Sequence, residues 1–288
     1  MRIALSIVAR VRVCGVVAVF ACLLCALCQA GSAKTDNLVK NPGFEEGKDV
    51  PVGWTKPDNL TVFWEAKGGV KGNGLRFDTD VYRKEWEAHK DAPDAKVEKT
   101  ETEGTKYNTV GGTAGVAVYS EPIPVEKDAW YLFEYDVKGP GGEPFIFLNG
   151  YWVATEEAVA KSGTKIFFKP FPNGPSFSLV AMGSSGEEKR PPVVGDYIMA
   201  FRRRFVVKLG EAPKSEKGDW RRYSGVVHFE KRFNVELVLL ELYAYWPPGN
   251  YFFDNILMRK VTEAEAQQVL DEKKKMGKAA NCGTRVGK

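Results

Sequence analysis

Three clusters in the sequence place large aromatic residues beside polar side chains, a combination that can bind a sugar ring. A sugar offers apolar C–H faces that stack on Trp or Tyr, and its hydroxyl groups need fixed partners such as Asp, Asn, Glu or Arg. The segments 149–152 and 241–246 and the pair at 64–65 each bring such residues to the end of an expected strand. For any one of these aromatics, core packing is the commoner role. The predicted binding residues are Trp64, Tyr151, Trp152, Tyr243, Tyr245 and Trp246.

Residues suited to catalysis are few. The chain has two histidines, His89 and His228, and neither has a cysteine or second histidine at metal-ligand spacing. No nucleophile elbow, phosphate-binding loop or dinucleotide fingerprint occurs. Glu85 and Glu87 flank Trp86; on one strand face they would lie about 7 Å apart, a spacing that glycoside cleavage could use, although paired surface acids are usually only solvated. We therefore expect no enzyme, and a polysaccharide hydrolase or lyase stays an alternative.

The first 33 residues read as an export signal. Arg2, Arg10 and Arg12 precede the apolar run 13–27, and small residues around Ala30 and Ala33 mark the expected cleavage site. The run is shorter than the roughly 20 residues that a membrane-spanning helix needs. We expect a secreted, periplasmic or cell-surface protein with no membrane insertion after cleavage.

Composition limits the remaining part of the chain. The formal net charge of +4 falls to +1 without the three signal arginines, which gives nucleic acid no electrostatic attraction. Four of the five cysteines lie in the signal, so Cys282 stays alone and no internal disulfide can form. The chain's 7 Trp, 11 Tyr and 17 Phe offer ample material for one large core. We expect three parts: the signal 1–33, one domain 34–261, and a helix with a tail 262–288.

Short stretches rich in β-branched and aromatic residues recur between Gly, Pro, Asn and Asp clusters, which is typical of an all-β sandwich or barrel. In the segment 129–137, Tyr131, Phe133, Tyr135 and Val137 fall on one face and Glu134 and Asp136 on the other, as in a half-buried antiparallel strand. Strands are predicted at 60–64, 74–77, 115–120, 129–137, 144–152, 165–168, 176–181, 197–209, 222–230, 235–245 and 251–258.

The other segments are expected to lie on the surface. The charged segment 82–109 predicts a long loop with at most one helical turn, and 155–162 predicts a short helix. The run 202–204 of three arginines predicts a solvated strand face. Thr262 and Glu265 form a capping box that predicts a terminal helix, and 277–288 is expected to fray.

A family resemblance extends this interpretation over residues 35–261. The segment 37–47, with Gly53 and Trp54 after it, resembles the opening strand of xylanase- and cellulase-associated carbohydrate-binding modules. The segments 219–223 and 249–257 resemble their last two strands, and 119–125 and 130–138 fit central strands. The chain departs from those compact modules by the extra segments 82–109 and 153–218.

The resemblance implies a galactose-binding-like jelly roll, whose first and last strands lie close together and hold a structural calcium ion. Glu45 and Asp254 stand at the matching positions. Calcium takes several oxygen ligands, so backbone carbonyls of that corner would complete the set. The alternative is two acids paired with arginines or solvated.

We thus expect a secreted, non-catalytic protein that binds a polysaccharide or glycan through aromatic platforms. This function rests on analogy. The alternative from another class is a structural or adhesion domain that binds protein partners through the extra segments or the terminal helix.

Overall fold

Alternating aromatic residues form the centre of the fold. In the computed structural model of the chain, strand β5 (Ala129–Lys138) buries Tyr131, Phe133, Tyr135 and Val137 at 0–1% exposure. Side chains alternate between the two faces of a strand, so these four residues face a second layer. The structure describes residues 37–91, 105–161, 167–170, 178–181, 195–213 and 218–286.

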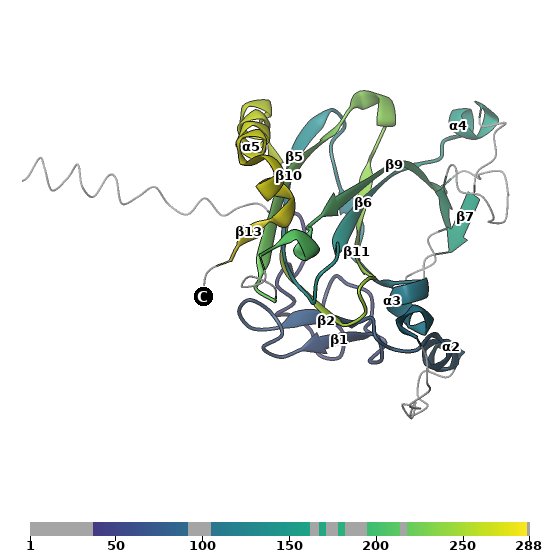
Figure 1. Cartoon of the computed structure of the whole chain (residues 1–288). Coiled ribbons are helices and arrows are strands. Elements are labelled where there is room, and N and C mark those ends of the chain that lie inside the picture. The colour runs from purple at the N-terminus through teal and green to yellow at the C-terminus, as the bar shows by residue number, and fades with distance from the viewer. Residues whose placement is uncertain are drawn as a thin grey trace, which may run out of the picture. The chain divides into compact units, whose positions relative to one another are not determined.

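β5 lies inside the first of two facing sheets (Figure 1). All its strand pairs are antiparallel, and β12 lies between β2 and β5. Among the described residues, its strands in spatial order are β1 (Val62–Glu65), β2 (Gly74–Asp78), β12 (Asn250–Val261), β5, β10 (Arg221–Phe229) and β13 (Thr284–Arg285).

The second sheet is antiparallel except where β8 and β9 run parallel. Its described strands in spatial order are β3 (Val116–Tyr119), β11 (Leu237–Ala244), β6 (Phe145–Val153), β9 (Tyr197–Val206), β8 (Ser178–Ala181) and β7 (Phe167–Pro170). The two-residue β4 (Ile123–Pro124) also pairs with β11. The two sheets form a jelly-roll β-sandwich, as the sequence predicts.

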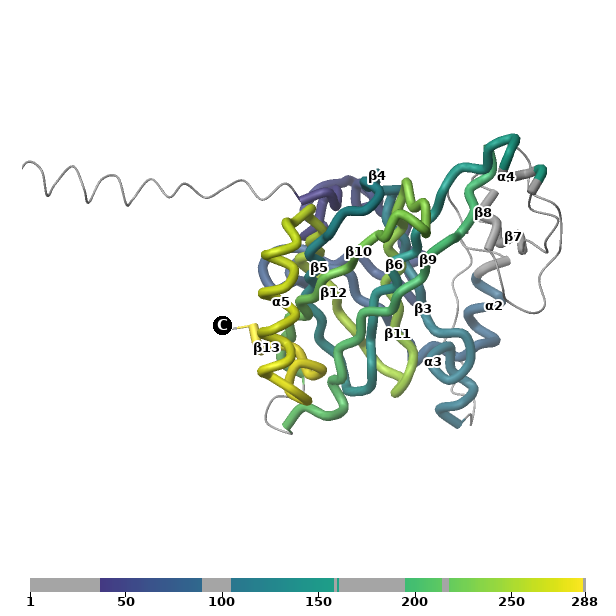
Figure 2. Tube along the Cα trace, turned by 90° about the horizontal axis from the view of Figure 1, so that it is seen from above, coloured from purple at the N-terminus to yellow at the C-terminus, as the bar shows by residue number. Residues whose placement is uncertain are grey.

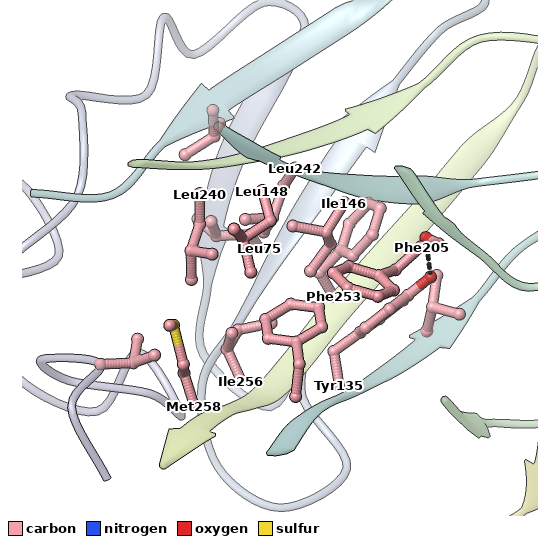
Figure 3. Packing of buried hydrophobic residues seen from close by; sticks show 14 of the residues in the cluster. Leu75, Tyr135, Ile146, Leu148, Phe205, Leu240, Leu242, Phe253, Ile256 and Met258 are labelled. Atoms are coloured by element: carbon pink, nitrogen blue, oxygen red, sulfur yellow. Dashed lines mark hydrogen bonds between the residues drawn. The ribbon is translucent and has the colours of Figure 1, made fainter. Parts of the chain in front are cut away.

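The core lies between the sheets (Figure 3). Phe253 of β12 packs 5.0 Å from Phe77 and 6.3 Å from Tyr135, measured between ring centroids. The hydroxyl of Tyr135 donates a 2.8 Å hydrogen bond to the Phe205 carbonyl of the facing sheet, so this buried polar group is satisfied. Burial raises the pKa of Tyr135 well above its ordinary value.

The predicted strands appear at their expected places, and the main error concerns segment 82–109. Instead of a loop it contains helix α2 (Arg83–Asp91) and the 3₁₀ turn η1 (Lys106–Asn108), and the single turn α3 (Val110–Thr113) follows directly after it; residues 92–104 are outside the described part. α2 is held because Glu85 and His89, four residues apart, are buried on one face, and the His89 Nε2 atom lies 2.8 Å from the Asp58 carbonyl. The predicted short surface helix is α4 (Glu156–Lys161).

Three further 3₁₀ turns complete the described elements: η2 (Leu209–Glu211), η4 (Lys231–Phe233) and η5 (Gly277–Cys282). The expected fraying of 277–288 is wrong for residues 277–286, because η5 leads into β13, which pairs with Arg221 and Arg222 of β10. Cys282 is a free thiol.

The predicted terminal helix is α5 (Glu263–Met276), and both hydrogen bonds of its capping box are present. Figure 2 shows α5 along β5 and β10, outside the first sheet and on the opposite side of the molecule from α2 and α3. Ala266 and Val269 of α5 pack on Leu132, Val226 and Val261 of that sheet. α5 therefore covers part of the first sheet's outer face.

The predicted export signal lies outside the described residues. Within the described part, the helices are too short or too polar to cross a bilayer.

Candidate functional site

The outer face of the second sheet, which points away from the core, gathers aromatic and charged residues from four strands. In the β11–β6 pairing, Tyr243 stands opposite Phe145 and Glu241 opposite Phe147. Directly opposed residues of a sheet share a face, so all four point the same way. The alternate residues of these strands, such as Leu240 and Leu242, point into the core and are fully buried.

Four rings form what we call the outer aromatic cluster: Phe145, Phe147, Tyr243 and Tyr245. Phe145 stacks on Tyr243 with ring centroids 4.9 Å apart and meets Phe147 edge-on at 4.7 Å. Tyr245 lies 5.9 Å from Tyr243. Phe145 is only 4% exposed, whereas the two tyrosines and Phe147 are half-buried. The cluster thus has a closed centre and a partly open margin formed by the tyrosines.

Beside this cluster lies a polar triad of Asn149, Arg202 and Glu241. Glu241 Oε2 accepts hydrogen bonds from Asn149 Nδ2 at 3.1 Å and from Arg202 Nη2 at 3.2 Å. A carboxylate can only accept, so the amide nitrogen of Asn149 must face it. Asn149 is 1% exposed, and its Oδ1 atom has no hydrogen-bond partner in the described structure. The triad is therefore a buried polar cluster in which the Asn149 Oδ1 acceptor is left unsatisfied.

The arginines on β9 also contact the rings, which corrects the expectation that 202–204 is only a solvated face. The guanidinium carbon of Arg202 lies 3.7 Å from the Phe147 centroid, and that of Arg204 lies 5.0 Å from the Phe145 centroid. Both contacts have cation–π geometry. Next to Glu241, burial first and then the negative charge of Glu241 raise the pKa of Tyr119.

The structure brings together three of the six predicted binding residues at one end of this face. Tyr243 and Tyr245 belong to the outer aromatic cluster. Trp246 follows directly and stacks on Tyr107 of η1, with centroids 5.1 Å apart and ring planes 11° from parallel. Tyr107 is 68% exposed, so this stack is accessible. The Tyr243 hydroxyl donates to the Ala114 carbonyl at 2.7 Å, which ties α3 to this end of the sheet.

The other three predicted residues lie elsewhere. Tyr151 is on the same face but 4% exposed, and burial raises its pKa. Trp152 points to the opposite side of β6, across from Ile198. Trp64 belongs to β1 of the other sheet, packs against the core, and donates its indole N–H to the Phe44 carbonyl at 2.7 Å. The six residues therefore do not line one common surface.

The acid pair considered for catalysis does not exist in the arrangement expected. Glu85 and Glu87 lie in helix α2, where residues two apart point about 200° away from each other. Glu85 is buried, and Glu87 pairs with Arg83 at 2.6 Å. Two carboxylates on opposite sides of a helix cannot flank one glycosidic bond.

Glu45 and Asp254, the expected metal ligands, both reach the loop of residues 67–73. Glu45 Oε1 accepts from the Asn73 N–H at 3.0 Å, and Asp254 Oδ2 accepts from the Val70 N–H at 2.6 Å. Burial raises the pKa of Asp254 to about 6.

Two glycines of this loop make room for the two acids. A Cβ atom on Gly72 would lie 2.1 Å from Glu45 Oε1, and one on Gly69 would lie 2.6 Å from Asp254 Oδ2 and 2.1 Å from the Asn73 carbonyl oxygen. Within the described ranges no group of three or more acidic, histidine or cysteine side chains could hold a metal. The corner offers oxygen donors of the hard type that calcium takes, with carbonyls as the further ligands required.

Phe145, Phe147 and Arg202 were not predicted as site residues, and Asn149 and Glu241 entered the prediction only as neighbours of aromatics. Their signal is present in the sequence as a period of two: Phe145, Phe147 and Asn149 on one strand, and Glu241 and Tyr243 on the other, with Tyr245 directly after its end. Grouping the alternate residues that share the outward face of each strand, rather than the residues near its end, would have identified them.

The chain matches no model of a known protein family, and no curated protein sequence is significantly similar to it. Solved structures similar to it include carbohydrate-binding modules. A family 16 carbohydrate-binding module has 12% identity and a TM-score of 0.38, over 77% of this chain and 99% of that one.

Two further modules are similar to the same degree. A CBM61 module in complex with β-1,4-galactotriose has 11% identity and a TM-score of 0.36, over 79% and 100%. The CBM22-1 xylan-binding domain of Paenibacillus barcinonensis Xyn10C has 13% identity and a TM-score of 0.32, over 79% and 96%. At these identities and TM-scores, the similarity decides nothing about what this chain binds.

Proposed function

We propose that this chain is an exported, non-catalytic protein that binds a polysaccharide or glycan on the outer face of the second sheet. The observation that carries the proposal is the outer aromatic cluster beside the polar triad on one face. Tyr243 and Tyr245 offer half-exposed rings for the apolar face of a sugar. Arg202 offers exposed donors for its hydroxyl groups, and Glu241, which Asn149 holds in place, offers acceptors.

Substitutions on the outer face of the second sheet test this proposal. In a polysaccharide array followed by titration calorimetry on the chain from Lys34 onward, Glu241→Gln is expected to weaken binding about 10-fold to 100-fold, because hydrogen bonds to a charged acceptor contribute about 1.5–3 kcal/mol. Tyr245→Ala is expected to weaken it about tenfold or more, since it removes a stacking ring. Trp220→Ala is the matched control, because this half-buried tryptophan lies on the first sheet beside Lys138.

Three outcomes separate the proposal from its rivals. Equal losses in the control and in both site variants would move the site away from this face. Release of reducing ends that Glu241→Gln abolishes would make the chain a hydrolase or lyase. Folded protein that binds no glycan would favour a structural or adhesion domain.

We also propose that Glu45, Asp254 and carbonyls of the 67–73 loop hold a structural calcium ion. A ligand bound only by the folded state at 100 times its dissociation constant adds about 2.7 kcal/mol of stability. The melting temperature is therefore expected to be higher with calcium than with a chelator. Asp254→Asn is expected to abolish this difference. Glu46→Gln, next to Glu45 and exposed, should keep it. An equal rise in the Asp254→Asn protein would contradict this site.

A further inference from the structure

A hollow lies between β9 of the second sheet and β5, β10 and α5 of the first-sheet side. It has a volume of about 440 Å³, within the range of small-molecule sites. Its lining includes Trp130, Phe201, Arg203, His228, Phe233 and Leu270. We call it the edge groove.

Aromatic rings form one part of the edge groove. Trp130 and His228 stand opposite each other on β5 and β10 and stack with centroids 4.5 Å apart and planes 4° from parallel. His228 Nε2 lies 3.1 Å from Asp128 Oδ1, which holds the imidazole in place. Leu270 of α5 is 37% exposed at the border, so apolar surface is open to a ligand here.

Positive charge without a counterion forms the other part. Arg203, which lines the groove, lies with its guanidinium carbon 5.3 Å from the Phe205 centroid, and Lys273 lies with Nζ 3.9 Å from the Tyr223 centroid. Neither cation forms an ion pair within the described residues, in contrast to Arg202 and Arg222. Lys273 is three residues from Leu270 and thus on the same side of α5.

The positive charges of Arg203 and Lys273 also repel each other. Burial first and then the charge of Arg203 lower the pKa of Lys273 to about 8. The acid in the groove lining, Glu230, is already paired with Arg232 at 2.9 Å. A carboxylate from a ligand would be the missing counterion.

We propose that the edge groove binds a carboxylate-bearing sugar unit of an acidic glycan, with Trp130 and His228 beside the ring and Arg203 and Lys273 on the carboxylate. Arg202 of the polar triad lines the groove as well, but none of the four rings of the outer aromatic cluster does. Tyr245→Ala therefore distinguishes this site from the one proposed above. The terminal helix lines the groove with Leu270 and carries Lys273, which interacts electrostatically with the lining residue Arg203. In this proposal α5 is part of a binding site as well as a cover for the first sheet.

The test uses an oligogalacturonide of about four units, its methyl ester, and a polyglutamate peptide, each titrated into the chain in chelator. The free acid is expected to bind and to weaken as salt is added, and the ester to bind at least tenfold more weakly. Arg203→Gln and Lys273→Gln should each weaken the acid at least tenfold. Lys274→Gln, the exposed neighbour on α5, and Tyr245→Ala on the outer face should not.

Stability separates a binding role from a structural one. Because Arg203 and Lys273 repel each other, Arg203→Gln and Lys273→Gln should leave the melting temperature unchanged or higher. Equal affinity for acid and ester, binding lost only in Tyr245→Ala, or no binding by folded protein would each overturn the proposal. If the chain binds polyglutamate but not the oligogalacturonide, the ligand is an acidic peptide and the proposed sugar is wrong.

Discussion

Replacing Phe253 by alanine is expected to lower the free energy of unfolding by about 3–5 kcal/mol. The ring is fully buried between the sheets, where it contacts Phe77 and Tyr135 (Figure 3). Removing it loses the transfer free energy of a large apolar side chain and leaves a cavity that rigid strands on both sides cannot fill. Such a loss is a large part of the 5–15 kcal/mol typical of a folded domain.

Urea unfolding, followed by tryptophan fluorescence and circular dichroism, measures this change. Phe252→Ala is the control. Phe252 is adjacent to Phe253 in sequence but points to the other side of β12, where its half-buried ring lies 4.3 Å from Lys138 Nζ. We expect the control to cost less than half as much. A loss below about 1 kcal/mol in Phe253→Ala would mean that the two sheets do not pack as described.

Replacing Arg222 by leucine is expected to lower the free energy of unfolding by about 2–4 kcal/mol at neutral pH. Asp136 is fully buried and accepts two hydrogen bonds from Arg222, at 2.8 and 2.7 Å, and one from Asn255 at 2.9 Å. Without the arginine, a buried carboxylate would keep a single neutral donor. The value lies below that of a fully enclosed pair because the Arg222 side chain is 41% exposed.

The double variant Arg222→Leu with Asp136→Asn separates the charge from the packing. Asparagine removes the unpaired charge and can still accept from Asn255, so the double variant should regain most of the lost stability. Arg259→Leu breaks an exposed pair with Glu265 at 3.4 Å and should cost no more than about 1 kcal/mol. If the double variant is as unstable as Arg222→Leu alone, the effect comes from lost side-chain contacts.

The strands were predictable because each carries its own signal. On β5, Tyr131, Phe133, Tyr135 and Val137 share one face while Glu134 and Asp136 lie on the other, and this local pattern indicates both the strand and its buried face. β13 was missed and β4 was expected only through the family resemblance of 119–125, because two residues hold no periodicity; both exist as strands only through pairing with β10 and β11.

Helix α2 was missed because its local sequence does not distinguish a helix from a strand. Its residues are mostly charged, and the alternation of Glu85, Trp86 and Glu87 fits a strand as well as a helix. What selects the helix is tertiary: His89 contacts the Asp58 carbonyl, and Trp86 packs against the core. Neither contact can be read from the local sequence.

The sequence indicated which types of residue form the site, but not which individual residues come together in it. The aromatic residues near Glu241 were recognised as suitable for stacking on a sugar, yet Trp64 was grouped with them although it lies on the other sheet. Phe145, Asn149 and Arg202 join Tyr243 and Glu241 only because the register of three strands places them side by side.

The amino-acid sequence by itself determined that this chain forms a β-sandwich with a capped terminal helix, since alternation, turn residues and the Thr262–Glu265 box act over a few neighbouring residues. The tertiary structure alone decided which side chains meet. Strand register and sheet order join residues about 40 to 180 positions apart, such as Arg202 with Glu241 and Val70 with Asp254, and no local pattern encodes those distances.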